Sequence, residues 1–286
     1  MAVTQIPNEL IEFGVKTFGT SSIMLGDTTT GTIDAANNNT GVGVDVFAAL
    51  TSGDNNTAIG FAALTATTTG PSNTAVGYQS MTSNTVGNSN VALGYQAMNS
   101  NVQGDRAVAV GYQALYTQNP SSANEDTFNT AVGFSSMALT TTGINNTAVG
   151  AKSLESNTTG TRNVAVGSNA LDAMTTGYNT TAVGHAALGA NTTANSNTAI
   201  GAFAMEVNTT GSANTAVGEG SLLTNTTGSN NVAIGYVAGR VATGDENVYL
   251  GVQAGDDSTG SGNTVVGYQA GYNNTSGHSN VHVGRH

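Results

Sequence analysis

Few residues in this chain have side chains that commonly perform catalysis or bind metals. Among 286 residues there are 17 Asp and Glu, 6 Lys and Arg, 4 His and no Cys. An enzyme needs acids, bases or nucleophiles that converge on one place. The abundant Ser and Thr lie in repeated turn sequences, without a His or carboxylate at a spacing that indicates catalysis. We therefore expect no catalytic residue, no enzymatic activity and no cofactor.

Three of the four histidines lie near the C-terminus and are the best candidates for metal binding. They are His278, His282 and His286. In a symmetric trimer, one histidine on the three-fold axis supplies three imidazoles, which suits a transition metal. An ordinary surface histidine is the alternative at each position. The sequence therefore predicts no metal site and leaves His282 as a weak candidate.

The elements that must position any functional side chain are repeats. The string Asn-Thr-Ala-Val-Gly, or a close variant, recurs along nearly the whole chain. We call its last residue the landmark glycine, and the step between landmarks is 17 residues, except for one step of 22 and two of 16. The landmark glycines are Gly43, Gly60, Gly77, Gly94, Gly111, Gly133, Gly150, Gly167, Gly184, Gly201, Gly218, Gly235, Gly251, Gly267 and Gly284. A fixed period of this length indicates stacked coils.

Each repeat predicts a three-residue strand just before its landmark glycine, as in Thr57-Ala58-Ile59. β-branched and aliphatic residues at alternate positions suit a pleated strand that buries one face. The Asn that precedes most of these strands predicts a ladder of stacked amides. A Gly seven residues before most landmarks predicts a turn with positive φ. The pattern predicts an all-β fold, a parallel β-solenoid (β-roll) of about 15 coils of 17 residues.

Ala occupies the middle of the strand in eleven consecutive coils. Neighbouring residues of a strand point to opposite faces, so Ala and the aliphatic residue should lie on opposite sides of the coil. We interpret the aliphatic residues as the buried side and Ala as a close contact with another copy. An exposed strand position that merely tolerates Ala is the alternative. The candidate interface with other copies is Ala58, Ala75, Ala92, Ala109, Ala131, Ala148, Ala165, Ala182, Ala199, Ala216 and Ala233.

The recurring Asn-Thr-Ala-Val-Gly, with Asn-Val-Ala-Ile-Gly at residues 231–235, resembles the head repeat of YadA-type trimeric autotransporter adhesins, which also occurs in bacteriophage tail fibres. The resemblance covers about residues 37–286. It implies a left-handed parallel β-roll and a homotrimeric fibre packed around a common axis. The stalk and membrane barrel of those adhesins and a secretory signal are not recognisable here. We therefore expect a phage fibre, located in the virion and assembled in host cytoplasm, with a bacterial trimeric adhesin head as the alternative.

The pattern divides the chain into three segments. Residues 37–238 hold the regular coils, and residues 239–286 hold variant coils, in which Gly replaces Leu or Met after the landmark. Residues 1–36 are expected to attach the fibre to a virion protein, of the tail rather than the capsid, with capping of the first coil as the alternative. The attachment candidates are Ile6, Leu10, Ile11 and Phe13.

The variant C-terminal coils and one insertion are the expected contacts with a glycan or protein of the host surface. The insertion lies between Gly111 and Gly133, and loops inserted into solenoids often protrude and bind. The host-contact candidates are Tyr116, Asn119, Tyr249, Tyr272 and His278.

One position after the landmark is aromatic in five successive coils. Tyr78, Tyr95 and Tyr112, flanked by Phe61 and Phe134, should form a stack of rings. Aromatic strips bind sugars in some proteins, but we expect this one to contribute stability.

Charge and hydropathy argue against two kinds of partner, and the threonine content suggests one further function. A net charge of −11 without a basic cluster argues against nucleic acid. No stretch approaches the ~20 apolar residues of a membrane span, so we expect no membrane insertion. The Thr content allows an ice-binding solenoid as a less favoured alternative. That activity would need exposed Thr, whereas the strand Thr is expected to face inward.

Overall fold

The computed structural model describes residues 14–18, 21–26, 35–122 and 125–285. These residues form strands and turns and contain no helix. They divide into two compact units, Met1–Gln113 with Gln118–Asp126, and Ala114–Thr117 with Thr127–His286. Together the units contain about 15 turns of a parallel β-solenoid with a repeat of about 17 residues, which confirms the predicted fold class. The attachment candidates Ile6, Leu10, Ile11 and Phe13, as well as His286, lie outside the described residues.

The first unit begins with a hairpin that covers one edge of its ladder. β1 (Gly14–Phe18) pairs antiparallel with β2 (Ser22–Gly26), which pairs in parallel with β3 (Thr40–Gly43). A covered edge protects main-chain groups that would otherwise recruit another strand. The parallel ladder continues through β4 (Thr57–Ile59), β5 (Thr74–Val76), β6 (Val91–Leu93) and β8 (Val108–Val110).

The ladder starts one coil earlier than the sequence analysis placed it. Ile23 and Leu25 lie in register with Thr40 and Val42, and Gly26 has a φ of 121°, close to that of the landmark glycines. The signal was present in the sequence, because Gly26 precedes Gly43 by 17 residues and follows an aliphatic residue. The described part of residues 1–36 therefore adds one coil to the ladder and covers its first edge.

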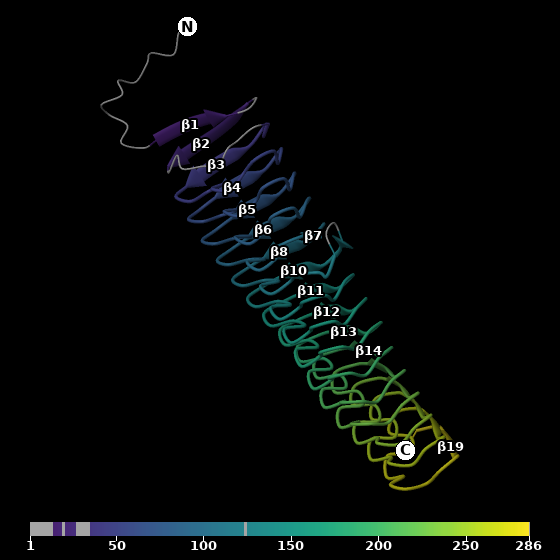
Figure 1. The fold of residues 1–286 in the computed structure, drawn as a ribbon. Helices are drawn as coiled ribbons and strands as arrows, with labels where there is room; N and C mark the ends of the chain where they lie inside the picture. Colours follow the sequence, from purple (N-terminus) through teal and green to yellow (C-terminus); the bar gives the residue numbers. More distant parts are fainter. Residues whose placement is uncertain (1–13, 19–20, 27–34, 123–124, 286) are drawn as a thin grey trace. The chain divides into compact units, whose positions relative to one another are not determined.

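The second unit is a single parallel ladder, drawn in teal to yellow in Figure 1. Each strand pairs in register with the equivalent strand of the next coil. Over most of the ladder, the first residue, Thr or Val, pairs with Thr or Val, and the central Ala pairs with Ala. Its strands are β10 (Thr130–Val132), β11 (Thr147–Val149), β12 (Val164–Val166), β13 (Thr181–Val183), β14 (Thr198–Ile200), β15 (Thr215–Val217), β16 (Val232–Ile234), β17 (Val248–Leu250), β18 (Thr264–Val266) and β19 (Val281–Val283).

The strand faces are inverted relative to the prediction. Ala points into its own coil and is fully buried within one chain, so the predicted Ala interface with another copy is wrong. The aliphatic residue of the same strand points outward; Ile200, for example, is 42% exposed. The residues corrected in this way are Ala58, Ala75, Ala92, Ala109, Ala131, Ala148, Ala165, Ala182, Ala199, Ala216 and Ala233.

The opposite wall of the coil explains why the strand supplies only Ala to the core. Leu or Met four residues after the landmark, such as Leu154, Leu171 and Met205, is fully buried across from the strand. These residues have φ near 50°, a left-handed conformation that costs an L-residue roughly 1–2 kcal/mol. Burial of a Leu or Met side chain contributes about 1.5–3 kcal/mol and offsets this strain. A large residue on one wall leaves room for a methyl group on the other.

The predicted amide ladder is confirmed, and its bonds run mainly between side chain and main chain. Asn163 is fully buried, and its Nδ2 donates to the carbonyl of Gly177 at 2.8 Å. Its Oδ1 accepts the main-chain N–H of Thr180 in the next coil at 3.0 Å. Such bonds satisfy main-chain groups at the strand entrance that burial would otherwise leave unpaired.

Two glycine files serve different purposes. Landmark glycines such as Gly167 have φ near 137°, a conformation accessible to glycine almost alone. The glycines seven residues before the landmark, such as Gly160, do not have positive φ, so that prediction is wrong. A Cβ on Gly160 would lie 2.5 Å from the carbonyl oxygen of Gly177 in the next coil. Close approach of neighbouring coils therefore excludes a side chain there.

Replacing Gly167 by Ala should destabilise the second unit by about 3 kcal/mol or more, through backbone strain and a clash. The new Cβ would lie 2.4 Å from the carbonyl oxygen of Gly184. Gly189→Ala is the matched control, because a Cβ there meets no atom closer than 3.3 Å and the residue lacks positive φ. Urea denaturation of both variants measures the difference. Equal midpoints would show that the landmark position accepts ordinary residues.

Candidate functional site

The most extensive candidate for an interaction is the outward face of the strands, which we call the outer stripe. It consists of the first and third residue of each strand of the second unit, for example Thr198 and Ile200 of β14. In the second unit the aliphatic members include Val149 at 38%, Val166 at 36% and Ile234 at 44% exposure. The Thr and Val members are partly exposed. Contiguous apolar surface of this kind marks an interface in many soluble proteins.

The predicted aromatic stack is present in the first unit. Phe61, Tyr78, Tyr95 and Tyr112 follow one another with ring centroids 5.1–5.3 Å apart and planes within 14°. Each ring is close to 43% exposed. Because the rings cover one another's faces, mainly their edges and hydroxyls reach solvent. A sugar ring that needs a free aromatic face finds none within the stack, which favours the stabilising role.

A glutamine ladder runs beside the aromatic stack. The Nε2 of Gln96 donates to the Oε1 of Gln79 at 3.0 Å, and Gln113 donates in the same way to Gln96 at 2.9 Å. These side chains are half-buried. Their amides are engaged with one another, so the ladder joins successive coils.

Tyr249 lies in the core and is not a host contact, so that prediction is wrong. It takes the place of Ala in β17 and is fully buried. A Cβ on Gly239 or Gly255 would lie within 2.6 Å of its ring, so these two glycines make the space that the ring fills. Burial raises the pKa of Tyr249, and the nearby Ser258 hydroxyl acts in the opposite direction. At Tyr249 the strand therefore carries the large side chain and the opposite wall carries glycine, which is the reverse of the regular coils.

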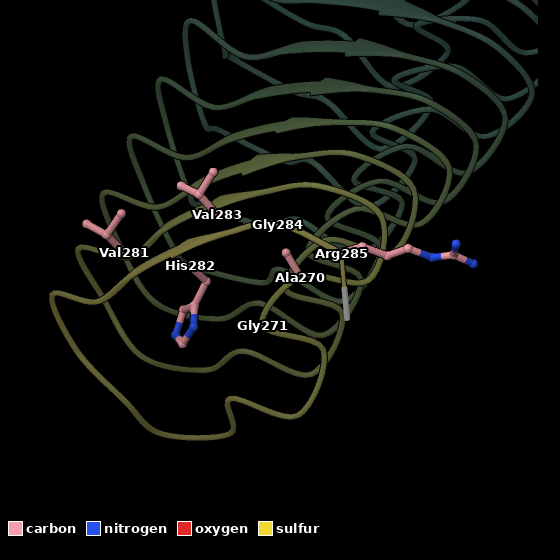
Figure 2. A pocket seen from close by; sticks show the side chains of 7 residues that line it. All are labelled: Ala270, Gly271, Val281, His282, Val283, Gly284 and Arg285. Carbon is pink, nitrogen blue, oxygen red and sulfur yellow. The ribbon is translucent and has the colours of Figure 1, made fainter.

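The C-terminal end of the second unit is hollowed. A cavity of about 330 Å³ is lined by Ala270, Gly271 and residues 281–285. Figure 2 shows the His282 imidazole projecting into the coil, whereas Val281 and Val283 project to the other side. Val281 and Val283 are 73% and 74% exposed, and Val283 is about twice as exposed as its equivalents Val149 and Val166.

The remaining host-contact candidates lie in different surroundings. Asn119 and His278 are exposed, whereas Tyr116 and Tyr272 are half-buried. The Nδ1 of His278 accepts the main-chain N–H of Ser261 at 3.0 Å. The contact of these residues with a host remains a prediction.

Part of the predicted insertion is tied to the first unit. β7 (Gly104–Asp105) and β9 (Glu125–Asp126) form a small parallel sheet, and Arg106 forms an ion pair with Asp126. The end of the insertion is therefore held to the first unit by the pairing of β9 with β7, in which Glu125 lies opposite Gly104.

Neither a metal site nor a membrane span is present in the described part of the chain. No cluster of three or more His, Asp or Glu side chains suited to a metal ion occurs there. His282 points into its own coil (Figure 2). Among residues 14–18, 21–26, 35–122 and 125–285, no helix is long and apolar enough to cross a bilayer.

The sequence has no recognised counterpart among the families and proteins compared with it. No family model matches the chain, and no curated protein matches it.

Proposed function

We propose that this chain is a structural protein of a phage fibre that assembles as a homotrimer and has no enzymatic activity. The outer stripe is the observation that carries the proposal. A monomer would leave Val149, Val166 and Ile200 each more than a third exposed on one continuous face. Three copies facing a common axis would remove this face from water, at about 25 cal/mol for each Å² of apolar area.

The remainder of the proposal comes from the resemblance of the repeat. The N-terminal segment attaches to the virion, at the tail rather than the capsid, and the C-terminal end contacts a host glycan or protein. A bacterial trimeric adhesin head uses the same assembly and is the alternative setting.

Two measurements test the fibre. Sedimentation equilibrium should give three times the mass of one chain, and gold-labelled antibody should mark purified virions at the tail. Label on a bacterial surface instead would favour the adhesin. A monomeric mass would overturn the fibre. Release of reducing ends from host polysaccharide would overturn the proposed lack of enzymatic activity.

One observation also favours the ice-binding alternative. The strand Thr, such as Thr147, Thr181 and Thr198, faces outward beside aliphatic residues, which removes the reason for rejecting this function. Ice binding and trimer formation would use the same face and therefore compete. Thermal hysteresis from a monomeric preparation would support ice binding and contradict the fibre.

A further inference from the structure

The fifth residue after the landmark glycine joins successive coils in the first unit. Thr82 donates its Oγ1 hydroxyl to the carbonyl of Ala62 in the preceding coil at 3.0 Å. Asn99 donates its Nδ2 to the carbonyl of Gln79 in the same way at 3.1 Å, and Thr65 makes the equivalent bond at 2.9 Å. In these coils a side chain of the next coil therefore satisfies the carbonyl at this place.

The same position in one coil of the second unit is Gly189, and the space beside it is open. A cavity of about 360 Å³ is lined by Gly189 and by residues of the two neighbouring coils. A Cβ on Gly189 would lie 3.8 Å from the carbonyl oxygen of Asn169, which is the equivalent of the Ala62 carbonyl. That carbonyl accepts no hydrogen bond within the described part of the chain. The cavity therefore lacks the donor that Thr82 provides in the first unit.

Further oxygen acceptors surround the open space. The Cβ position on Gly189 is 3.3 Å from the carbonyl oxygen of Ala186 and 3.5 Å from the Oδ1 of Asp172. Asp172 holds the fifth position one coil before Gly189, and Glu206, which also lines the cavity, holds it one coil after. Equivalent positions two coils apart are separated by about 9.6 Å along the ladder. The cavity therefore has a carboxylate residue toward each end.

The two carboxylates have no cation of their own. Among the described residues, no Lys, Arg or His forms an ion pair with Asp172 or Glu206. Lys152, whose charge acts on Asp172, is itself paired with Glu155 at 3.4 Å. Burial raises the pKa of Asp172, because the carboxylate loses water without gaining an ion pair. A positive charge in the cavity would offset this loss.

We propose that this cavity binds a small aliphatic diamine, with one ammonium group at Asp172 and the Asn169 carbonyl and the other at Glu206. An ammonium group carries three donors and no acceptor, which suits the oxygens around Gly189. The methylene chain of the diamine packs on apolar side chains. The cavity supplies these from Ala173, Ala190 and Val207.

Two other cations fit this cavity less well. A metal ion needs several ligands close to one point, and the described residues hold no group of three His, Asp or Glu side chains suited to one. A single ammonium group, such as that of a lysine on a partner, would leave one of the two carboxylates without a cation. The site is also independent of the proposed trimer, because none of its lining residues belongs to a strand.

Isothermal titration calorimetry of the whole chain with 1,4-diaminobutane tests the proposal. The solution should contain about 0.15 M salt, which screens general attraction to a chain of net charge −11. We expect one diamine to bind per chain, and 1-aminobutane, which has one ammonium group, to bind at least about tenfold more weakly. Absence of binding, equal affinity for 1-aminobutane, or displacement of the diamine by an equal concentration of calcium would each overturn the proposal.

Gly189→Thr restores the donor of the first unit and should close the site. Gly189 lacks positive φ, so a threonine fits the backbone there. Its hydroxyl should bond to the Asn169 carbonyl, as that of Thr82 does to Ala62. We expect a melting temperature no lower than that of the original chain and diamine binding at least about tenfold weaker. Unimpaired binding by this variant would place the diamine elsewhere and overturn the proposal.

Variants of the two carboxylates test the ends of the site. Asp172→Asn and Glu206→Gln should each weaken binding at least about tenfold, with circular dichroism unchanged. Glu219→Gln is the matched control, because Glu219 is exposed in the same unit and does not line the cavity. It loses the same charge and should bind within about twofold of the original chain. Equal effects of all three substitutions would indicate general attraction to negative charge and overturn the proposal.

Discussion

Replacing Ala165 by Glu should unfold the coils around β12, with a loss of about 4 kcal/mol or more. Ala165 is fully buried between Ala148 and Ala182 of the neighbouring coils. A Glu side chain there overpacks the coil against Leu154 and Leu171 and buries a carboxylate without a cation. Urea denaturation, with hydrogen exchange of β11 to β13, measures the loss.

Ala165→Ser is the control for this substitution, because it adds one small hydroxyl at the same position. We expect its midpoint to fall by much less than that of Ala165→Glu. If Ala165→Glu kept the original stability but no longer formed oligomers, the strand Ala residues would lie on the outer face. That result would contradict the buried position of Ala165.

The repeat predicted the coil but not which strand face forms its core. Alternation in Thr-Ala-Val separates two faces, yet both hold residues that a core accepts. Placing the aliphatic residues in the core puts Ala on the outer face. In a coil of 17 residues, Leu154 and its equivalents already occupy the interior from the opposite wall, and only Ala fits beside them.

The variant coils contained the signal that decides between the two faces. Where Gly239 and Gly255 replace Leu or Met, Tyr249 replaces Ala. Such a paired exchange of volumes indicates residues that share one core, because interiors are closely packed. Its place in the variant C-terminal coils predicts Tyr249 as a host contact, but its compensating glycines show why it is buried.

The direction of the hydrogen bonds between coils could not be predicted from the sequence pattern. Gly255, for example, donates its N–H to the carbonyl of Ala270 in the following coil. The repeat predicts that coils stack, but the bonding direction comes from the geometry of the turns. The hairpin of β1 and β2 was likewise not predicted, because its first strand does not follow the repeat.

Replacing Val166 by Glu should convert the proposed trimer into monomers that stay folded. Val166 is 36% exposed in the single chain, so a Glu there can reach water and costs the monomer little. In a trimer closed on the outer stripe, three carboxylates would lie near one axis without cations. We expect dissociation to increase by at least about a thousandfold, which corresponds to about 4 kcal/mol. Sedimentation equilibrium measures the mass, and circular dichroism verifies the fold.

Thr159→Glu is the matched control, because Thr159 is an exposed turn residue at a distance in sequence from the strand. It adds the same charge to the same coil and should leave the trimer intact. If Val166→Glu still forms a trimer, the outer stripe is not the interface. If the original chain is itself monomeric, the stripe is exposed in solution and the trimer proposal is wrong. Adjacent residues thus separate the two roles of one strand: Ala165 should report on the core and Val166 on the assembly.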